Sequence, residues 1–288
     1  MRHRPPPLPE ASRLPAENIQ QLNHAITLLT KLQKESSNHP EYRYLLALCH
    51  REREDRGDTE GGETAIRILT DLSQEYPLIA DYRYELSETL ARLNSRAVGD
   101  DEFLHTRERL LKALAYADAL VEEHPNIPEY AHSRAHPSHK LSYVYLRIAW
   151  QRDRQSRRAS IREAEKYCRQ AVAIQAEIVE QSDQAPTHQL WLAEMQESLA
   201  KVLEQQAKIP EARMTVEASI ASLHKLLEEH PDFYISHGYL AKQYRTLIHI
   251  LEQLDEVEAI AVAREQVRMH RQKLPVGGRV PPREEAPR

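Results

Sequence analysis

The chain has 288 residues, of which 39 are Lys or Arg and 44 are Asp or Glu, so its formal net charge is −5. This mild acidity gives no general attraction to nucleic acid, and no run of apolar residues is long enough for insertion into a membrane. Only 7 glycines occur, which disfavours Gly-rich phosphate-binding loops and strand hairpins. We therefore expect a cytoplasmic helical protein without a cofactor, and neither nucleic acid nor a membrane among its partners.

The two ends of the chain differ in composition from the rest. Five of the 17 prolines fall within the first fifteen residues, and the last fourteen residues are similar in character. Proline-rich, polar segments of this kind do not bury enough apolar surface to fold. We expect a disordered leader over residues 1–15, one helical repeat domain over 16–274, and a disordered tail over 275–288.

Between these ends, apolar residues recur with the period of amphipathic helices, and no segment alternates as a strand would. In chain order the expected helices span 17–36, 41–54, 63–75, 80–96, 103–123, 137–152, 160–182, 186–206, 210–229, 232–253 and 256–273. Ser160 followed by Glu163 indicates a capping box at the start of one of them. Pro137 disfavours helical conformation at His136, so we expect a loop there and a helix that starts at residue 137.

One pattern recurs before each interruption of the helices. A small residue is followed, about one turn apart, by two further apolar or small residues and then by the interruption. The clearest copies are Ala65, Leu69 and Leu72 before Pro77, Ala113, Ala117 and Leu120 before Pro125, and Ser219, Leu223 and Leu226 before Pro231. A large–small pair follows each interruption, as in Leu46-Ala47, Leu86-Ser87, Leu192-Ala193 and Leu240-Ala241. Repeating units of this size cover one another's apolar faces, which predicts a stacked helical array.

This pattern resembles the tetratricopeptide repeat (TPR) family over roughly residues 17–273. The best matches are Leu240-Ala241 with Tyr244, and Ala65, Leu69 and Leu72 with Pro77. The family's opening Trp is missing, Ala or Ser replaces its Gly, and the interruptions do not keep the family's spacing of about 34 residues. The resemblance implies an all-α fold, a right-handed α-solenoid of about five antiparallel helix pairs plus an extra N-terminal helix. The chain also looks like the degenerate TPR tails of bacterial signalling proteins, which adjoin Ser/Thr kinase or anti-sigma modules.

Two clusters could carry chemistry, and each has a plainer interpretation. His132, His136 and His139 have a spacing that could present three imidazoles to a metal ion, but Pro137 interrupts them, so we expect no metal site. The densest basic cluster, which we interpret as a solvated inter-helix loop rather than a phosphate site, consists of Arg147, Arg152, Arg154, Arg157, Arg158 and Arg162. No nucleophile or metalloenzyme motif occurs. We therefore expect no catalytic residues and no enzymatic activity.

The helices that follow the interruptions carry tyrosines and charged residues at regular positions. The TPR resemblance implies that these helices line a concave groove, and it places toward that groove Tyr44, Arg51, Tyr84, Glu88, Arg92, Glu194, Lys242 and Arg245. A wall of Tyr, Arg and other charges suits the capture of a peptide or helix. We expect a non-enzymatic scaffold whose partner is another protein. The alternative is a regulatory or sensor portion of a bacterial signalling system, linked to a kinase or a sigma/anti-sigma pair, without its catalytic or transcription module.

Overall fold

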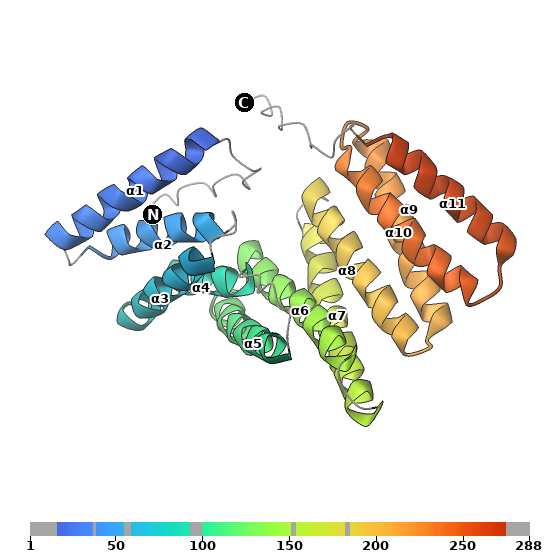
Figure 1. The fold of residues 1–288 in the computed structure, drawn as a ribbon, viewed down its shortest axis with the longest axis horizontal. Helices are drawn as coiled ribbons and strands as arrows, with labels where there is room; N and C mark the ends of the chain where they lie inside the picture. The colour runs from blue at the N-terminus through green and yellow to red at the C-terminus, as the bar shows by residue number, and fades with distance from the viewer. Residues whose placement is uncertain are drawn as a thin grey trace. The chain divides into compact units, whose positions relative to one another are not determined.

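The computed structural model describes residues 16–36, 39–54, 59–92, 100–150, 154–181 and 185–274. All regular structure in these residues is α-helical (Figure 1). The helices are α1 (Ala16–Glu35), α2 (Pro40–Glu54), α3 (Thr59–Glu75), α4 (Ala80–Arg92), α5 (Asp100–Glu123), α6 (Pro128–Trp150), α7 (Arg154–Gln181), α8 (Pro186–Gln205), α9 (Ile209–Glu229), α10 (Ile235–Glu252) and α11 (Val257–Gln272). The predicted all-α repeat fold is therefore confirmed. The predicted leader and tail lie outside the described residues.

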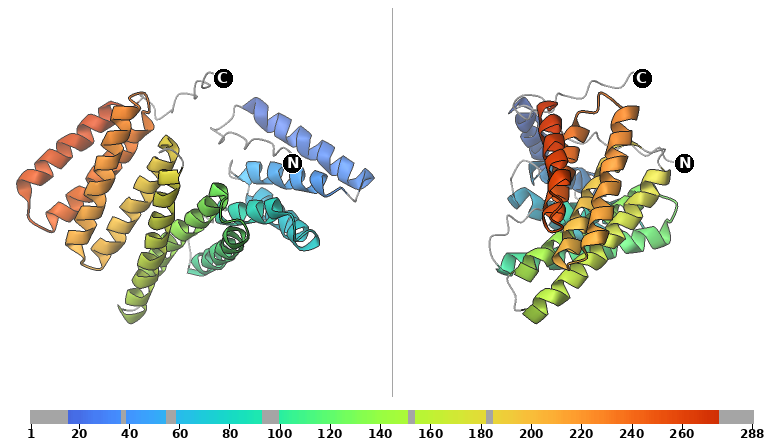
Figure 2. Two further views of the ribbon diagram at one scale, coloured as in Figure 1. Left: turned by 180° about the vertical axis from the view of Figure 1, so that it is seen from behind. Right: turned by 90° about the vertical axis from the view of Figure 1, so that its right-hand side faces the viewer.

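The helices form two compact units whose boundary falls within α4, after Thr89. In the first unit α1 packs on α2, and α2 packs on α3. In the second unit each helix from α5 to α10 packs on the next one in the chain. Alternate helices also meet, most extensively where α8 touches α6 and α10. Figure 2 shows the helices from two further sides. Contacts restricted to near neighbours in the chain are the mark of a repeat protein.

The recurring sequence pattern supplies the core of both units. Ala65, Leu69 and Leu72 are fully buried in the first unit. The equivalent residues of α5 and α9 are also buried, namely Ala113, Ala117, Leu120, Ser219, Leu223 and Leu226. The small residue of each copy lets two helix backbones approach, and the larger ones fill the space beside it.

Helix α6 begins earlier than the sequence predicts. It runs unbroken from Pro128 to Trp150 with Pro137 inside it, so the predicted loop and the helix start at residue 137 are wrong. An internal proline removes one backbone hydrogen bond and costs about 3 kcal/mol. The long helix packs against α5, α7 and α8, and Pro137 itself is buried. The burial of apolar surface between α6 and its three neighbours, to which the Pro137 ring contributes, offsets the free-energy cost of the lost hydrogen bond.

Helix α7 also begins early, at Arg154. Ser160 consequently lies inside the helix, and the predicted capping box at its start is wrong. The basic cluster is likewise not an inter-helix loop, because Arg157, Arg158 and Arg162 lie on α7 and Arg147 lies on α6; Arg152 is outside the described residues. The sequence before Ser160 contains good helix formers that extend the helix toward its N-terminus.

Two turns in the second unit have the same backbone geometry. Ala207, between α8 and α9, and Asp255, between α10 and α11, both adopt left-handed conformation, with φ of 58° and 55°. The amide of the next residue then closes the turn in each case. Lys208 N donates to the Leu203 carbonyl at 3.0 Å, and Glu256 N donates to the Leu251 carbonyl at 3.2 Å. The turns are therefore copies of one helix-terminating motif.

Candidate protein-binding faces

In the first unit, α2 and α4 lie side by side through two pairs of side chains. The rings of Tyr44 and Tyr82 are 5.2 Å apart, and Arg51 forms an ion pair with Glu85. Burial is the main reason that the pKa of Tyr44 is raised, and the nearby charge of Glu85 adds to it. Two of the predicted groove residues, Tyr44 and Arg51, thus already serve contacts within the unit. Of the other two in this unit, Tyr84 is partly buried and Glu88 is 4% exposed.

The second unit brings α6, α8 and α10 together along one face, which we call the α6–α8–α10 face. From the contacts given below and from helical register, we assign to it the exposed or partly buried residues Tyr143 and Arg147 of α6, Trp191, Glu194, Ser198 and Lys201 of α8, and Lys242 and Arg245 of α10. The Nε2 atom of His139 on α6 lies 2.8 Å from the Ser198 hydroxyl. On the other side of α8, Lys242 Nζ lies 3.6 Å from a carboxylate oxygen of Glu194. These contacts align the three helices. They also bring together two of the predicted groove residues, Glu194 and Lys242.

A buried carboxylate holds the centre of this face. Glu197 is only 1% exposed, and it accepts from Lys201 at 2.6 Å and from Lys242 at 2.8 Å. The Thr246 hydroxyl donates to it at 3.0 Å. Burial opposes ionisation of Glu197, but the hydrogen bonds from the two lysines outweigh it, and the pKa of this carboxyl is lowered. Glu197 therefore stays ionised and fixes both lysines in position.

On the α6–α8–α10 face, the carboxylates have partners within the molecule, whereas two arginines have no carboxylate partner among the described residues. All the carboxylates of α8 and α10 have partners: Glu194 and Glu197 pair with lysines, Glu204 accepts from Gln253, and Glu252 pairs with Arg264. By contrast, Arg147 and Arg245 are exposed and have no carboxylate partner among the described residues. Arg147 lies over the Phe103 ring at 5.4 Å, and Arg245 Nε donates to the Ala241 carbonyl at 3.3 Å. Among the described residues, the anions of α8 and α10 are thus engaged, whereas Arg245 of α10 and Arg147 of α6 have no carboxylate partner.

Aromatic side chains lie on the same face. Trp191 stacks on His132 with ring centroids 4.2 Å apart, and His188 meets Trp191 edge-on at 5.2 Å. Tyr143, one helical turn before Arg147, is 60% exposed, and Trp150 at the end of α6 is 63% exposed. Arg157 covers one side of the Trp150 ring at 4.9 Å. Exposed Tyr, Trp and Arg are the side chains that dominate protein interfaces energetically.

The three histidines of the candidate metal pattern lie on one continuous helix but have separate surroundings. His132 stacks on Trp191, and His139 contacts Ser198. Burial, followed by the charge of Lys140, lowers the pKa of His136 well below its usual value, and Arg92 adds to this effect. Arg92, another predicted groove residue, ends α4. No group of three His, Cys, Asp or Glu side chains is arranged around a metal position in the part of the chain that the structure describes.

Several residues of this face are not predicted by the sequence. Glu197 follows the predicted Glu194 by one helical turn, and that spacing is the available signal. Arg147 falls within the predicted helix 137–152, but the sequence groups it with a basic cluster interpreted as an inter-helix loop and does not predict it as a binding residue. The sequence does not single out Tyr143 or Trp191. None of the described helices combines the length and the apolarity that a bilayer crossing requires.

Comparisons with known proteins show the fold of the chain but no family. No family model matches the sequence, and no curated protein matches it. Among solved structures, the crystal structure of BtubC (BKLC) from P. vanneervenii has a TM-score of 0.58 at 15% identity, over 94% of this chain and 96% of that one. At this identity the similarity shows a shared fold.

Lower-scoring structures include TTC0263, a thermophilic TPR protein in Thermus thermophilus, with a TM-score of 0.42 and 18% identity over 78% of this chain and 92% of that one. The TPR2AB domain of yeast Sti1, in complex with pHSP90, has a TM-score of 0.32 and 18% identity over 89% of this chain and 92% of that one.

Proposed function

We propose that this protein is a non-enzymatic interaction scaffold whose α6–α8–α10 face binds an acidic peptide or helix of a partner protein. The observation that carries the proposal is the imbalance of charge on that face. The carboxylates of α8 and α10 are engaged within the molecule, whereas Arg147 and Arg245 are exposed without a carboxylate partner among the described residues.

The mechanism is presentation of a prearranged surface. Lys242 and Lys201 are held by the buried Glu197, so little side-chain entropy remains to be lost when a partner binds. Exposed Tyr143 offers a flat, amphipathic surface next to Arg147. A partner carboxylate would then form charge-assisted hydrogen bonds to the guanidinium groups. A regulatory part of a kinase- or sigma-linked system would use the same face, and no described residue favours that alternative.

The test is selection of ligands from a random peptide display library by the full chain. We expect the selected peptides to be enriched in Asp and Glu, and their affinity to fall as salt concentration rises. In the double variant Arg147→Ala, Arg245→Ala, affinity for a selected peptide should fall roughly tenfold, equivalent to about 1.4 kcal/mol.

The matched control is the double variant Arg158→Ala, Arg162→Ala. These two arginines are also exposed, and the control makes the same change in net charge on α7. Selected peptides without acidic enrichment, or an equal loss of affinity in the two double variants, would contradict the proposal.

A further inference from the structure

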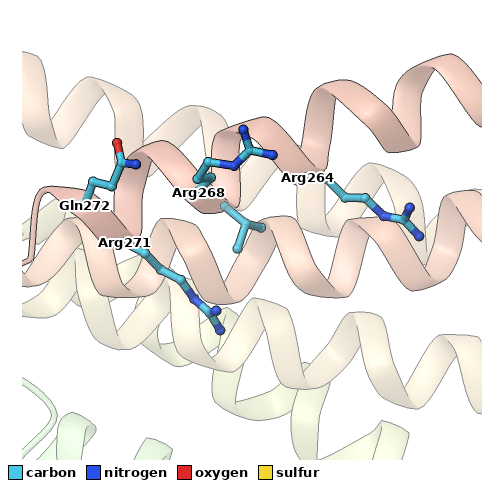
Figure 3. A pocket seen from close by; sticks show the side chains of 5 residues that line it. Arg264, Arg268, Arg271 and Gln272 are labelled. Atoms are coloured by element: carbon cyan, nitrogen blue, oxygen red, sulfur yellow. The ribbon is translucent and has the colours of Figure 1, made fainter.

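Helix α11 has a shallow attachment to the rest of the second unit. Of its 16 residues, the buried ones are Ala263 and His270. Arg264, Arg268, Arg271 and Gln272 line an open depression along the helix, shown in Figure 3. The outward side of this helix is thus lined mainly by polar and charged side chains. Ala259 and Ile260 pack against the core while only partly buried, and Arg264 pairs with Glu252 of α10. One of the two fully buried residues of this helix is therefore a titratable side chain, and we call it the His270 anchor.

The His270 anchor meets two other histidines and a tyrosine. Its Nδ1 atom lies 2.9 Å from Nδ1 of His237 on α10. Its ring stacks on Tyr244 of α10, with centroids 5.9 Å apart. His224 of α9 lies 5.5 Å away, centroid to centroid, and places its Nε2 atom 2.9 Å from the Tyr244 hydroxyl. We call these four residues the histidine cluster. It joins three helices that are neighbours in Figure 1.

The contact between His237 and His270 limits how many protons the cluster can hold. One Nδ1 atom must carry a hydrogen and the other must accept it. If both rings became imidazolium, both Nδ1 atoms would carry hydrogens, so the hydrogen bond would be lost and two like charges would face each other. His237 is 8% exposed and His270 is 2% exposed. The Nε2 atom of His270 is buried and has no partner among the described residues.

The charged surroundings do not compensate for added protons. Burial, followed by the charges of His237, His224 and Lys273, lowers the pKa of His270 to about 4. Burial also lowers the pKa of His237 and of His224, and Lys273, which follows α11, acts in the same direction on both. Glu228 of α9 opposes this at His224. The neighbouring hydroxyl, that of Tyr244, has its pKa raised by burial and stays neutral.

We propose that the histidine cluster is a pH-sensitive latch, which holds α11 on α9 and α10 at neutral pH and releases it on acidification. The core cluster that includes Ala263 also contains Leu247, Ile250 and Leu251 of α10. Release of α11 would therefore uncover an apolar surface of α10.

The sign of the effect follows from which form of His270 the attached state prefers. A histidine whose pKa is lower when α11 is attached than when it is released favours attachment only while it is neutral. Attachment is therefore at full strength above the ordinary histidine pKa of 6.5 and weakens as pH falls from there toward about 4. A single histidine whose pKa is about 4 in the attached state and 6.5 in the released state is enough to shift the equilibrium between attached and released α11. Release at about pH 5 should therefore be at least about tenfold more favourable than at about pH 7.5.

The experiment is amide hydrogen exchange of the full chain at these two pH values, corrected for the intrinsic pH dependence of exchange. We expect the protection of α11 to fall at least about tenfold between them, while that of α5 and α7 changes by less than about threefold. An equal change in α5, α7 and α11 would overturn the proposal.

The variant His270→Asn keeps a polar atom near the position of Nδ1 but does not titrate. It should reduce the pH-dependent loss of protection in α11 to about threefold or less. The matched control is His230→Asn, which removes an exposed histidine at the end of α9 and should behave like wild type. Retention of the full pH dependence in His270→Asn would overturn the latch.

A measurement on the wild-type protein keeps the proposal testable if His270→Asn does not fold. The imidazole C–H signal of His270 can be followed by NMR as pH is lowered. We expect it to titrate well below 6.5 and together with the signals of α11. Titration at or above 6.5 would overturn the proposal. Neither result depends on whether the α6–α8–α10 face binds peptides.

Discussion

At the scale of single residues, the sequence is most informative about buried apolar positions and least informative about buried charge. Their spacing singles out Ala65, Leu69 and Leu72, which are fully buried. A small residue followed at helical spacing by larger apolar ones is the pattern that close packing of two helices requires. Glu197 carries no such signal. Whether a glutamate is exposed or held by two lysines depends on which helices become neighbours, and Lys242 lies two helices further along the chain.

The burial of Glu197 leads to a prediction about stability. In Glu197→Ala, the Thr246 hydroxyl loses an acceptor and Lys242 loses its nearest counter-ion. We expect the free energy of unfolding to fall by about 2 kcal/mol, a value between those of exposed and fully buried pairs because both lysines can still reach water. Urea denaturation measures it.

Glu229→Ala is the control, since this glutamate pairs with Lys225 at 3.6 Å and both side chains are largely exposed. It should cost less than about 0.5 kcal/mol. Because the pKa of Glu197 is lowered from 4.5 in the folded protein, its contribution is present above that pH and is lost as pH falls through the folded pKa. The difference between wild type and Glu197→Ala should accordingly narrow in acid; a constant difference would argue against an ionised Glu197.

At the scale of the helix, local sequence signals locate most elements but misplace two starts. Pro137 indicates a boundary and Ser160 a cap, yet both lie inside helices. Proline and serine indicate only the local conformational preference of the backbone. The helices α6 and α7, by contrast, pack extensively against each other. Tertiary packing of this extent outweighs a boundary signal worth about 1–3 kcal/mol. The face formed by α6, α8 and α10 could not be assigned residue by residue for the same reason.

The glycine in α10 gives a second prediction. Gly238 lies in the first turn of this helix, and a methyl group added there would meet Leu274 Cδ2 at 3.8 Å, an ordinary van der Waals contact. Gly238→Ala should therefore raise the free energy of unfolding by about 0.5–1 kcal/mol, because alanine loses less backbone entropy in a helix. Thermal or urea denaturation measures the change. A loss of stability would mean that Leu274 is held more rigidly than this spacing suggests.

At the scale of the whole molecule, the units described here consist of helices that touch mainly their neighbours in the chain. Stability in such an array is a sum of local terms, so a core defect should act locally. The all-α class and the repeat are predictable because they depend on composition and periodicity. The division into two units within α4 is not, because no proline, glycine or charge run marks Thr89.

Paired core substitutions test this local behaviour. Leu203 of α8 and Leu69 of α3 are both fully buried, and replacing either with alanine should cost about 3 kcal/mol through the cavity that is left. In hydrogen exchange, we expect Leu203→Ala to lower protection in α8 and α9, and Leu69→Ala to lower it in α2 and α3. If each variant lowered protection uniformly over both units, the chain would unfold as one cooperative body.

The two left-handed turns give the second unit interchangeable junctions. Because Ala207 and Asp255 end α8 and α10 in the same way, α8 could pass through that turn directly into α11 if residues 208–255 were excised. The segment between the junctions is thus a cassette whose removal or duplication requires no new loop. An array of this kind can change length by splicing, and excision of this cassette would also delete His224, His237 and Tyr244, so that the shortened protein would keep its last helix without its sensitivity to acid.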